Sequence, residues 1–137
     1  MKYIVYISTA VRLFSDTDLS SLLEESRGNN ASHQLTGMLL FSDGTFVQVL
    51  EGDDEWVDAT YDKISRDSRH KNIIVLDEGP LQERLFPEWS MGFRNVLAKD
   101  FSALKGYIDP NSKRQWLNNS DHPAMYILKN FVDVNRF

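Results

Sequence analysis

Strand-like and helix-like segments follow one another along the first 76 residues in an order that few folds accommodate. Residues 2–8 (KYIVYIS) are β-branched and aromatic, with no breaker, and predict a buried strand. Residues 35–41 and 45–50 predict two further strands, and the intervening Asp43-Gly44 is a strong signal for a hairpin. Residues 73–76 predict a fourth strand, after a polar turn over residues 66–72.

Two helices are predicted between these strands. The first begins at residues 15–18 (SDTD), where a serine and acids suit a helix N-terminus, and ends at residues 28–30 (GNN), where glycine and asparagine favour a stop. Its apolar stripe consists of Leu19, Leu22 and Leu23, continued by Ser26. The second helix follows the acids at residues 53–55, and its apolar face consists of Trp56, Val57, Tyr61 and Ile64.

The resulting order, β-α-β-β-α-β, is typical of the ferredoxin-like arrangement, an α+β fold in which right-handed crossovers place both helices on one face of the sheet. Residues 89–96 predict a short fifth strand after a loop at residues 79–87, which extends the order to βαββαββ. Residues 100–108 and a segment from Pro123 predict C-terminal helices, the last with an apolar face of Ala124, Ile127, Leu128 and Phe131. We expect residues 1–96 to form one domain and residues 97–137 a helical cap on its opposite face, within the same globular unit.

The composition removes several classes of function. The chain has no cysteine, which excludes disulfides, thiolate zinc sites, cysteine nucleophiles and light sensors that form a cysteinyl-flavin adduct. The 3 histidines lack metal-ligand spacing, so we expect no metal. A formal net charge of −5 argues against nucleic acid as the main partner. No apolar stretch approaches the roughly 18 residues that span a bilayer, and no leader is evident, so we expect no membrane contact and a cytoplasmic protein.

Gln48 is the first residue whose type needs an explanation. Strand alternation puts it on the same face as Phe46 and Leu50, and a buried amide without a partner costs about 1–3 kcal/mol. Tyr6, in a first strand that is normally interior in this topology, can supply a partner. Plain structural interpretations remain open: Gln48 as a core glutamine bonded to backbone, Tyr6 as packing and Asn30 as a helix stop.

Six segments occur together, in one order and at one set of spacings: residues 5–8 (VYIS), 27–30 (RGNN), 35–37 (LTG), 46–52 (FVQVLEG), 66–70 (RDSRH) and 86–91 (FPEWSM). With them, about residues 1–96 resemble the BLUF family, sensors of blue light using flavin. FVQVLEG and WSM are the most specific of these segments. One departure is Leu85, which stands where an arginine is common in the family.

The resemblance implies a flavin held non-covalently between the two helices, edge-on to the sheet, with FAD expected and FMN or riboflavin left open. Gln48 would bridge Tyr6 and the flavin, and Asn30 would bond the carbonyl and imide edge of the ring. Arg69 and His70 would lie near the phosphate tail, where the plainer interpretation is a solvated basic turn. Candidates for the apolar walls are Leu22, Trp56, Tyr61 and Ile64. The residues expected around the cofactor are Tyr6, Ser8, Leu22, Arg27, Asn29, Asn30, Gln48, Ile64, Arg69 and His70.

The resemblance also implies a photocycle that forms no covalent bond. Tyr6 would donate an electron and then a proton through Gln48, which is left rotated or tautomerised. Trp89 and Met91, two residues apart on the predicted fifth strand, would carry the change toward the C-terminal helices.

These features predict a blue-light photoreceptor in signal transduction rather than an enzyme, because residues 97–137 show no pattern of an effector domain. Its output would reach an unidentified downstream protein or its own homo-oligomer. The alternative is a light-independent ferredoxin-like module for protein interaction. An acylphosphatase-like enzyme would need a glycine-rich loop with an arginine after the first strand, and residues 9–14 hold Arg12 without a glycine. An RNA-binding module would need exposed aromatics and a basic face.

Overall fold

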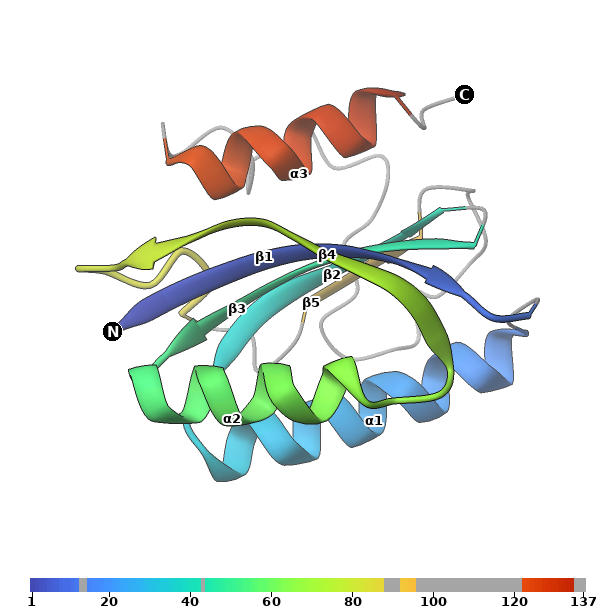
Figure 1. Ribbon diagram of the computed structural model, residues 1–137, viewed down its shortest axis with the longest axis horizontal. Helices are drawn as coiled ribbons and strands as arrows, with labels where there is room; N and C mark the ends of the chain where they lie inside the picture. The colour runs from blue at the N-terminus through green and yellow to red at the C-terminus, as the bar shows by residue number, and fades with distance from the viewer. Residues whose placement is uncertain (13–14, 43, 88–91, 96–121, 135–137) are drawn as a thin grey trace.

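The computed structural model describes residues 1–12, 15–42, 44–87, 92–95 and 122–134. One five-stranded sheet forms the middle layer. Helices α1 (Asp16–Ser32) and α2 (Asp54–Ser65) cover one face of the sheet, and α3 (Pro123–Val134) lies on the other (Figure 1). The predicted ferredoxin-like α+β architecture is therefore confirmed, with two helices together on one side as the crossover rule requires.

The strands lie in the order β4-β1-β3-β2-β5. The first four pair antiparallel, whereas β5 runs parallel to β2. The register between β1 and β3 places Tyr6 directly opposite Gln48. The predicted hairpin between β2 and β3 is also present, with Gly44 at φ +83°, a conformation that glycine adopts without strain. The bounds of the strands are β1 Lys2–Ala10, β2 Thr36–Ser42, β3 Thr45–Gly52, β4 His70–Pro80 and β5 Gly92–Asn95.

Both faces of the central strands are buried, so these strands are apolar at nearly every position. The face toward α1 and α2 packs Ile4, Leu39, Phe46 and Leu50 against Leu19, Leu23 and Val57. The face toward α3 packs Val5, Met38, Leu40, Val47 and Val49 against Ala124, Met125 and Leu128. Polar residues interrupt the first of these faces at Tyr6, Ser8 and Gln48, all buried.

Helix α1 begins as predicted but ends later. The Ser15 hydroxyl accepts from the backbone N–H of Asp18 (3.1 Å), and the Asp18 carboxylate accepts from the backbone N–H of Ser15 (3.0 Å). The predicted stop at residues 28–30 is wrong, because the helix continues to Ser32 and the chain turns at Gln34, with φ +56°. A glycine inside a helix costs only about 1 kcal/mol, which the surrounding packing outweighs.

The region after α2 also differs from the expectation. Strand β4 covers His70–Pro80 rather than residues 73–76, so it takes in part of the predicted turn and loop. β4 is an edge strand with two register shifts against β1. Because an edge strand is open to solvent, it can contain polar residues, and its ends therefore lack the apolar pattern that predicts a strand. In α2, Val57 is buried as predicted, but Trp56 is 43% exposed and stacks on His33, with ring centroids 3.7 Å apart.

The fifth strand is present as Gly92–Asn95, and the rest of residues 89–96, including Trp89 and Met91, lies outside the described residues. The predicted helix at residues 100–108 also lies outside them. Helix α3 starts at Pro123 as predicted. The assignment of residues 97–137 to one globular unit with the rest stays a prediction. In the described part of the chain, every helix is too short or too polar to cross a lipid bilayer.

Glu51 ties the loop between β4 and β5 to the sheet. Its carboxylate is fully buried and accepts from the backbone N–H groups of Leu85 (2.7 Å) and Phe86 (2.8 Å) and from the Thr36 hydroxyl (2.7 Å). The Arg84 guanidinium closes this cluster by donating to Thr36 Oγ1 (2.9 Å). The departure at Leu85 therefore leaves the loop anchored, because the anchor uses the backbone of that residue.

Candidate functional site

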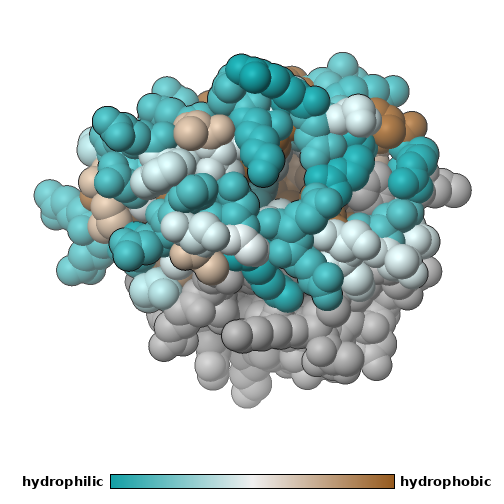
Figure 2. All heavy atoms as spheres, turned by 90° about the horizontal axis from the view of Figure 1, so that it is seen from below, coloured by the Kyte–Doolittle hydropathy of each residue, from teal (hydrophilic) through white to brown (hydrophobic). Residues whose placement is uncertain are grey.

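A cavity lies between α1 and α2, over the sheet face that carries Tyr6 and Gln48. Its empty space is about 740 Å³, a figure that includes the part open to solvent. Figure 2 shows the face formed by these helices: most of it is hydrophilic, and hydrophobic atoms are visible at the bottom of a hollow. The cavity is thus an apolar slot with a polar rim.

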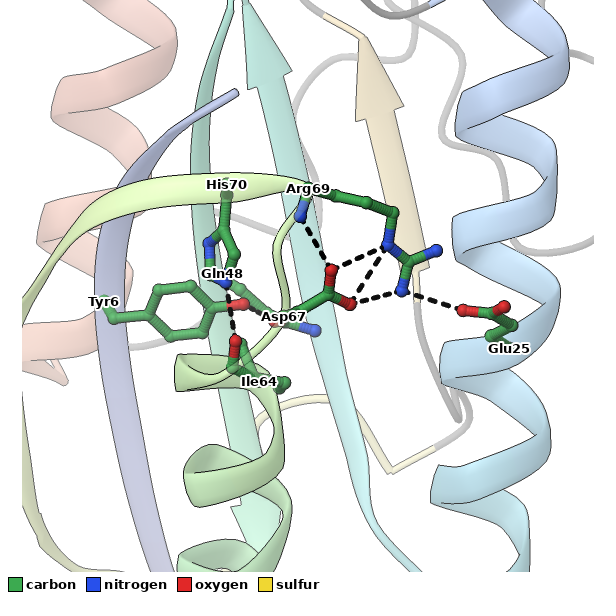
Figure 3. Close-up of polar contacts among 7 residues, drawn as sticks. All are labelled: Tyr6, Glu25, Gln48, Ile64, Asp67, Arg69 and His70. Carbon is green, nitrogen blue, oxygen red and sulfur yellow. Dashed lines mark hydrogen bonds and ion pairs between the residues drawn. The ribbon is translucent and has the colours of Figure 1, made fainter. Parts of the chain in front are cut away.

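The floor of the cavity holds a hydrogen-bonded pair. Tyr6 on β1 faces Gln48 on β3, and the Tyr6 hydroxyl donates to Gln48 Oε1. Each side chain is only 4% exposed. The buried amide therefore has the partner that its position demands, and its nitrogen lies on the side away from the phenol (Figure 3).

The rings around Tyr6 keep its hydroxyl out of water. Tyr61 of α2 meets the Tyr6 ring edge-on, with centroids 5.8 Å apart, and the His70 ring lies at 6.3 Å. His70 Nε2 is 2.6 Å from the backbone carbonyl oxygen of Ile64, which fixes the orientation of the imidazole. Burial raises the pKa of the Tyr6 hydroxyl well above its usual range, with smaller effects from Tyr61 and Asp67. The phenol is therefore a protonated donor at neutral pH.

Small polar side chains form the inner wall. Asn30 is buried, and the Asn29 amide donates to Asn30 Oδ1 (3.4 Å) and to Thr60 Oγ1 on α2 (3.2 Å). Ser8 is 1% exposed, and among the described residues its hydroxyl has no hydrogen-bond partner. An unsatisfied buried hydroxyl costs about 1–3 kcal/mol, so a ligand that can bond Ser8 would be favoured at this position.

Charged side chains lie toward the rim. The Asp67 carboxylate accepts from the backbone N–H and the Nε of Arg69, both at 2.9 Å, and Arg69 Nη2 pairs with Glu25 of α1 at 2.8 Å (Figure 3). The hydrogen bonds with Arg69 lower the pKa of Asp67, and the same bonds raise the pKa of Arg69. Asp67 and Arg69 are therefore both charged at neutral pH. Lys63 adds a second cation to the lining.

One cavity brings together nine of the ten residues that the sequence suggested around a cofactor: Tyr6, Ser8, Leu22, Asn29, Asn30, Gln48, Ile64, Arg69 and His70. Arg27 is the exception, since it does not line the cavity. Of the suggested wall residues, Trp56 and Tyr61 do not line it either, although Tyr61 packs on Tyr6 from behind. The role of each residue toward a cofactor stays a prediction.

The lining also includes residues that the sequence did not single out, among them Glu25, Thr60, Lys63 and Asp67. The sequence does contain a pattern that indicates Glu25. It is three residues after Leu22 and four before Asn29, a spacing that puts all three on one side of α1. Thr60 and Lys63 have the i, i+3 spacing on α2, whereas Asp67 lies just beyond the end of that helix.

The family model described as sensors of blue-light using FAD, BLUF, matches residues 1–92. This chain belongs to the BLUF family. It is therefore a blue-light sensor domain that uses a flavin, and its cavity suits that group. The walls offer Leu22 and Ile64 for the flat ring, and the floor offers amides and the unsatisfied Ser8 hydroxyl for its polar edge.

Two relatives are photoactivated adenylate cyclase subunits of Euglena gracilis. The beta subunit is 33% identical and the alpha subunit 39% identical over 136 residues, covering 88% of this chain. The BLUF chain spans only 16% and 13% of their respective lengths.

Solved structures show the same fold. A bacterial light-regulated adenylyl cyclase is 29% identical, with a TM-score of 0.71, over 97% of this chain and 34% of its own. The dark-state structure of the BLUF protein BlrB is 31% identical, with a TM-score of 0.67, over 70% of this chain and 73% of its own.

Proposed function

We propose that Tyr6 and Gln48 are the photoactive pair of this BLUF domain and that the flavin lies between α1 and α2. The observation that carries the proposal is the position of the pair, which is buried, hydrogen-bonded and at the floor of the cavity. The family membership supports light sensing through a flavin. The comparisons give no support to a light-independent interaction module.

A bound flavin supplies the absorption of blue light and, when excited, a strong electron acceptor. The chain supplies the groups that respond. Tyr6 is an oxidisable side chain at the floor, and its hydroxyl proton already points along a hydrogen bond to Gln48 Oε1. The Gln48 amide has an acceptor end and a donor end, so a half-turn or a tautomer change exchanges the two at fixed points. The response therefore needs no covalent bond to the protein.

FAD is the proposed cofactor, in line with the family description, and FMN and riboflavin are the alternatives because all three share the ring. Asn29, Asn30 and Ser8 would bond the polar edge of the ring. Arg69 would face the phosphate tail: no hydrogen bond joins its Nη1 to any described residue. Its other nitrogens are held by carboxylates, which orients the guanidinium in advance.

We propose that the output reaches a protein partner or a second copy of the chain through β5. β5 pairs with β2, which pairs with the β3 strand that carries Gln48. The net worth of a hydrogen-bond rearrangement is about 1–2 kcal/mol, well below the roughly 5.5 kcal/mol that a complete two-state switch requires. Light would therefore bias an existing interface modestly. Trp89 and Met91 as carriers, a protein partner and a cytoplasmic location stay predictions.

Absorption spectroscopy of the purified protein tests the proposed function. Before illumination we expect a flavin spectrum with resolved bands, because the ring sits in an apolar slot. Blue light should shift the main band slightly to the red, and darkness should reverse the shift. A flavin band that bleaches without shifting would contradict the Tyr6–Gln48 mechanism, and failure to bind added FAD, FMN or riboflavin would contradict the proposed site.

Replacing Ser8 with alanine should separate the stability of the protein from its affinity for flavin. The substitution removes a buried hydroxyl with no described partner, so the free energy of unfolding without added flavin should stay equal or rise by up to about 1 kcal/mol. Flavin affinity should fall about 3- to 10-fold, the worth of one hydrogen bond. Urea unfolding and fluorescence titration measure the two quantities. Ser42→Ala is the matched control, because that hydroxyl is also buried and has no partner in the described part of the chain, but lies outside the cavity lining.

A further inference from the structure

An ion pair joins the two walls of the cavity at its mouth. Glu25 projects from α1, and Arg69 belongs to the segment that leads from α2 into β4 (Figure 3). Both residues line the cavity, and their charged groups are 2.8 Å apart. The Glu25 side chain is 65% exposed, whereas Gln48 at the floor is 4% exposed. The pair therefore lies at the opening, above the groups that face the ring.

The Arg69 side chain is held by more contacts than the Glu25 side chain. Four hydrogen bonds from the backbone N–H, Nε and Nη2 of Arg69 attach the residue to Asp67, two positions earlier in the chain. Glu25 sits at an exposed position in the middle of α1, and its contact with Arg69 is its only described ion pair. Arg69 is thus the fixed half, and the pair opens by rotation of the Glu25 side chain alone.

We propose that Glu25 and Arg69 form a clasp that controls how fast flavin enters and leaves the cavity. The inference rests on the proposed function, since it takes the cavity to be the flavin site. Glu25 of α1 and Arg69 line opposite sides of this mouth, so a flavin that enters here passes between α1 and the segment that carries Arg69. An ion pair across that path raises the barrier in both directions. It changes the two rates by the same factor and leaves the affinity nearly unchanged.

A simple electrostatic role for Glu25 makes a different prediction. If its carboxylate only repelled the flavin phosphate, removing the charge would speed uptake and slow release, and the affinity would rise. Riboflavin separates the two roles because it carries the same ring without a phosphate. A clasp acts on riboflavin and FMN alike, whereas repulsion acts on FMN only.

The test compares Glu25→Gln with the unchanged protein, using stopped-flow fluorescence to follow uptake and release of riboflavin and of FMN. We expect both rates to rise about two- to fivefold for both ligands, the range that a partly exposed ion pair supports, with affinity within about twofold of the original. Salt at 1 M should raise both riboflavin rates in the unchanged protein but not in the variant, because salt screens the pair. Glu24→Gln is the matched control, since Glu24 is the exposed neighbour on α1 that does not line the cavity.

Each outcome decides the matter. Equal rates in Glu25→Gln and Glu24→Gln would overturn the clasp while leaving the flavin site intact. Faster uptake with slower release, for FMN only, would replace the clasp with electrostatic repulsion. Failure of the unchanged protein to bind riboflavin, FMN and FAD would overturn the proposed function and the clasp together.

Discussion

Replacing Tyr6 with phenylalanine is expected to abolish the light-induced red shift while leaving flavin bound. Phenylalanine fills the same volume beside Tyr61 but cannot be oxidised readily and carries no hydroxyl proton for Gln48 Oε1. The apolar walls of the slot do not change, and the lost hydroxyl donates to Gln48. Flavin affinity should therefore stay within about threefold, less than the loss of a hydrogen bond to the ligand itself. Difference absorption spectra under blue light measure the effect.

Tyr3→Phe is the matched control for that experiment. Tyr3 lies on the same strand, but its side chain faces the other side of the sheet, where its hydroxyl donates to Asp77 at 2.7 Å. The Tyr3 variant should keep the complete red shift. A Tyr6→Phe protein that binds flavin and still switches fully would rule out Tyr6 as the donor. Loss of the shift in both variants would point to a general disturbance of β1.

The largest effect on stability is expected for Glu51→Ala. The substitution leaves the backbone N–H groups of Leu85 and Phe86 and the hydroxyl of Thr36 without their acceptor, and it opens a cavity beneath the loop. An unsatisfied buried donor costs about 1–3 kcal/mol, so we expect the free energy of unfolding to fall by about 3–5 kcal/mol. Urea unfolding followed by circular dichroism measures the change.

Two further variants test whether the loss of stability comes from the Glu51 carboxylate. Glu78→Ala removes a carboxylate from an exposed position on β4, and its free energy of unfolding should stay within about 0.5 kcal/mol of the original. Glu51→Gln keeps one oxygen acceptor, so it should lose less than the alanine variant. If Glu51→Ala costs less than about 1 kcal/mol, the loop does not depend on this carboxylate for its anchorage.

The strands and helices that carry a strong apolar pattern could be predicted from the sequence. β1, β2 and β3 are buried on both faces, so their composition alone marks them, and the Asp43-Gly44 turn fixes how two of them pair. The edge strand β4 was predicted too short, because solvent on its outer side permits charged and polar residues. The end of α1 was misplaced, because Asn29 makes a contact with Thr60 on α2 that no local rule contains.

The buried part of the site could be predicted because its polar residues stand out against apolar neighbours. Gln48 and Tyr6 belong to this class, and the register confirms that they face each other. The rim could not be predicted in the same way. Glu25 and Asp67 have ordinary residue types for a helix surface and a turn. Asp67 meets Arg69 locally, two residues along the chain, whereas Glu25 meets it only because α1 approaches the start of β4. Exposed charges carry little information until the fold places them together.

The most direct test of the account is a light-minus-dark infrared difference spectrum of the flavin-bound protein. If the Gln48 amide exchanges its acceptor and donor ends on illumination, the hydrogen bonding to the flavin carbonyls changes. A flavin carbonyl band should then move to lower frequency in the light and return in darkness, and Gln48→Ala should lack this movement. Carbonyl bands that stay at their dark positions while the visible absorption shifts would contradict a hydrogen-bond switch at Gln48.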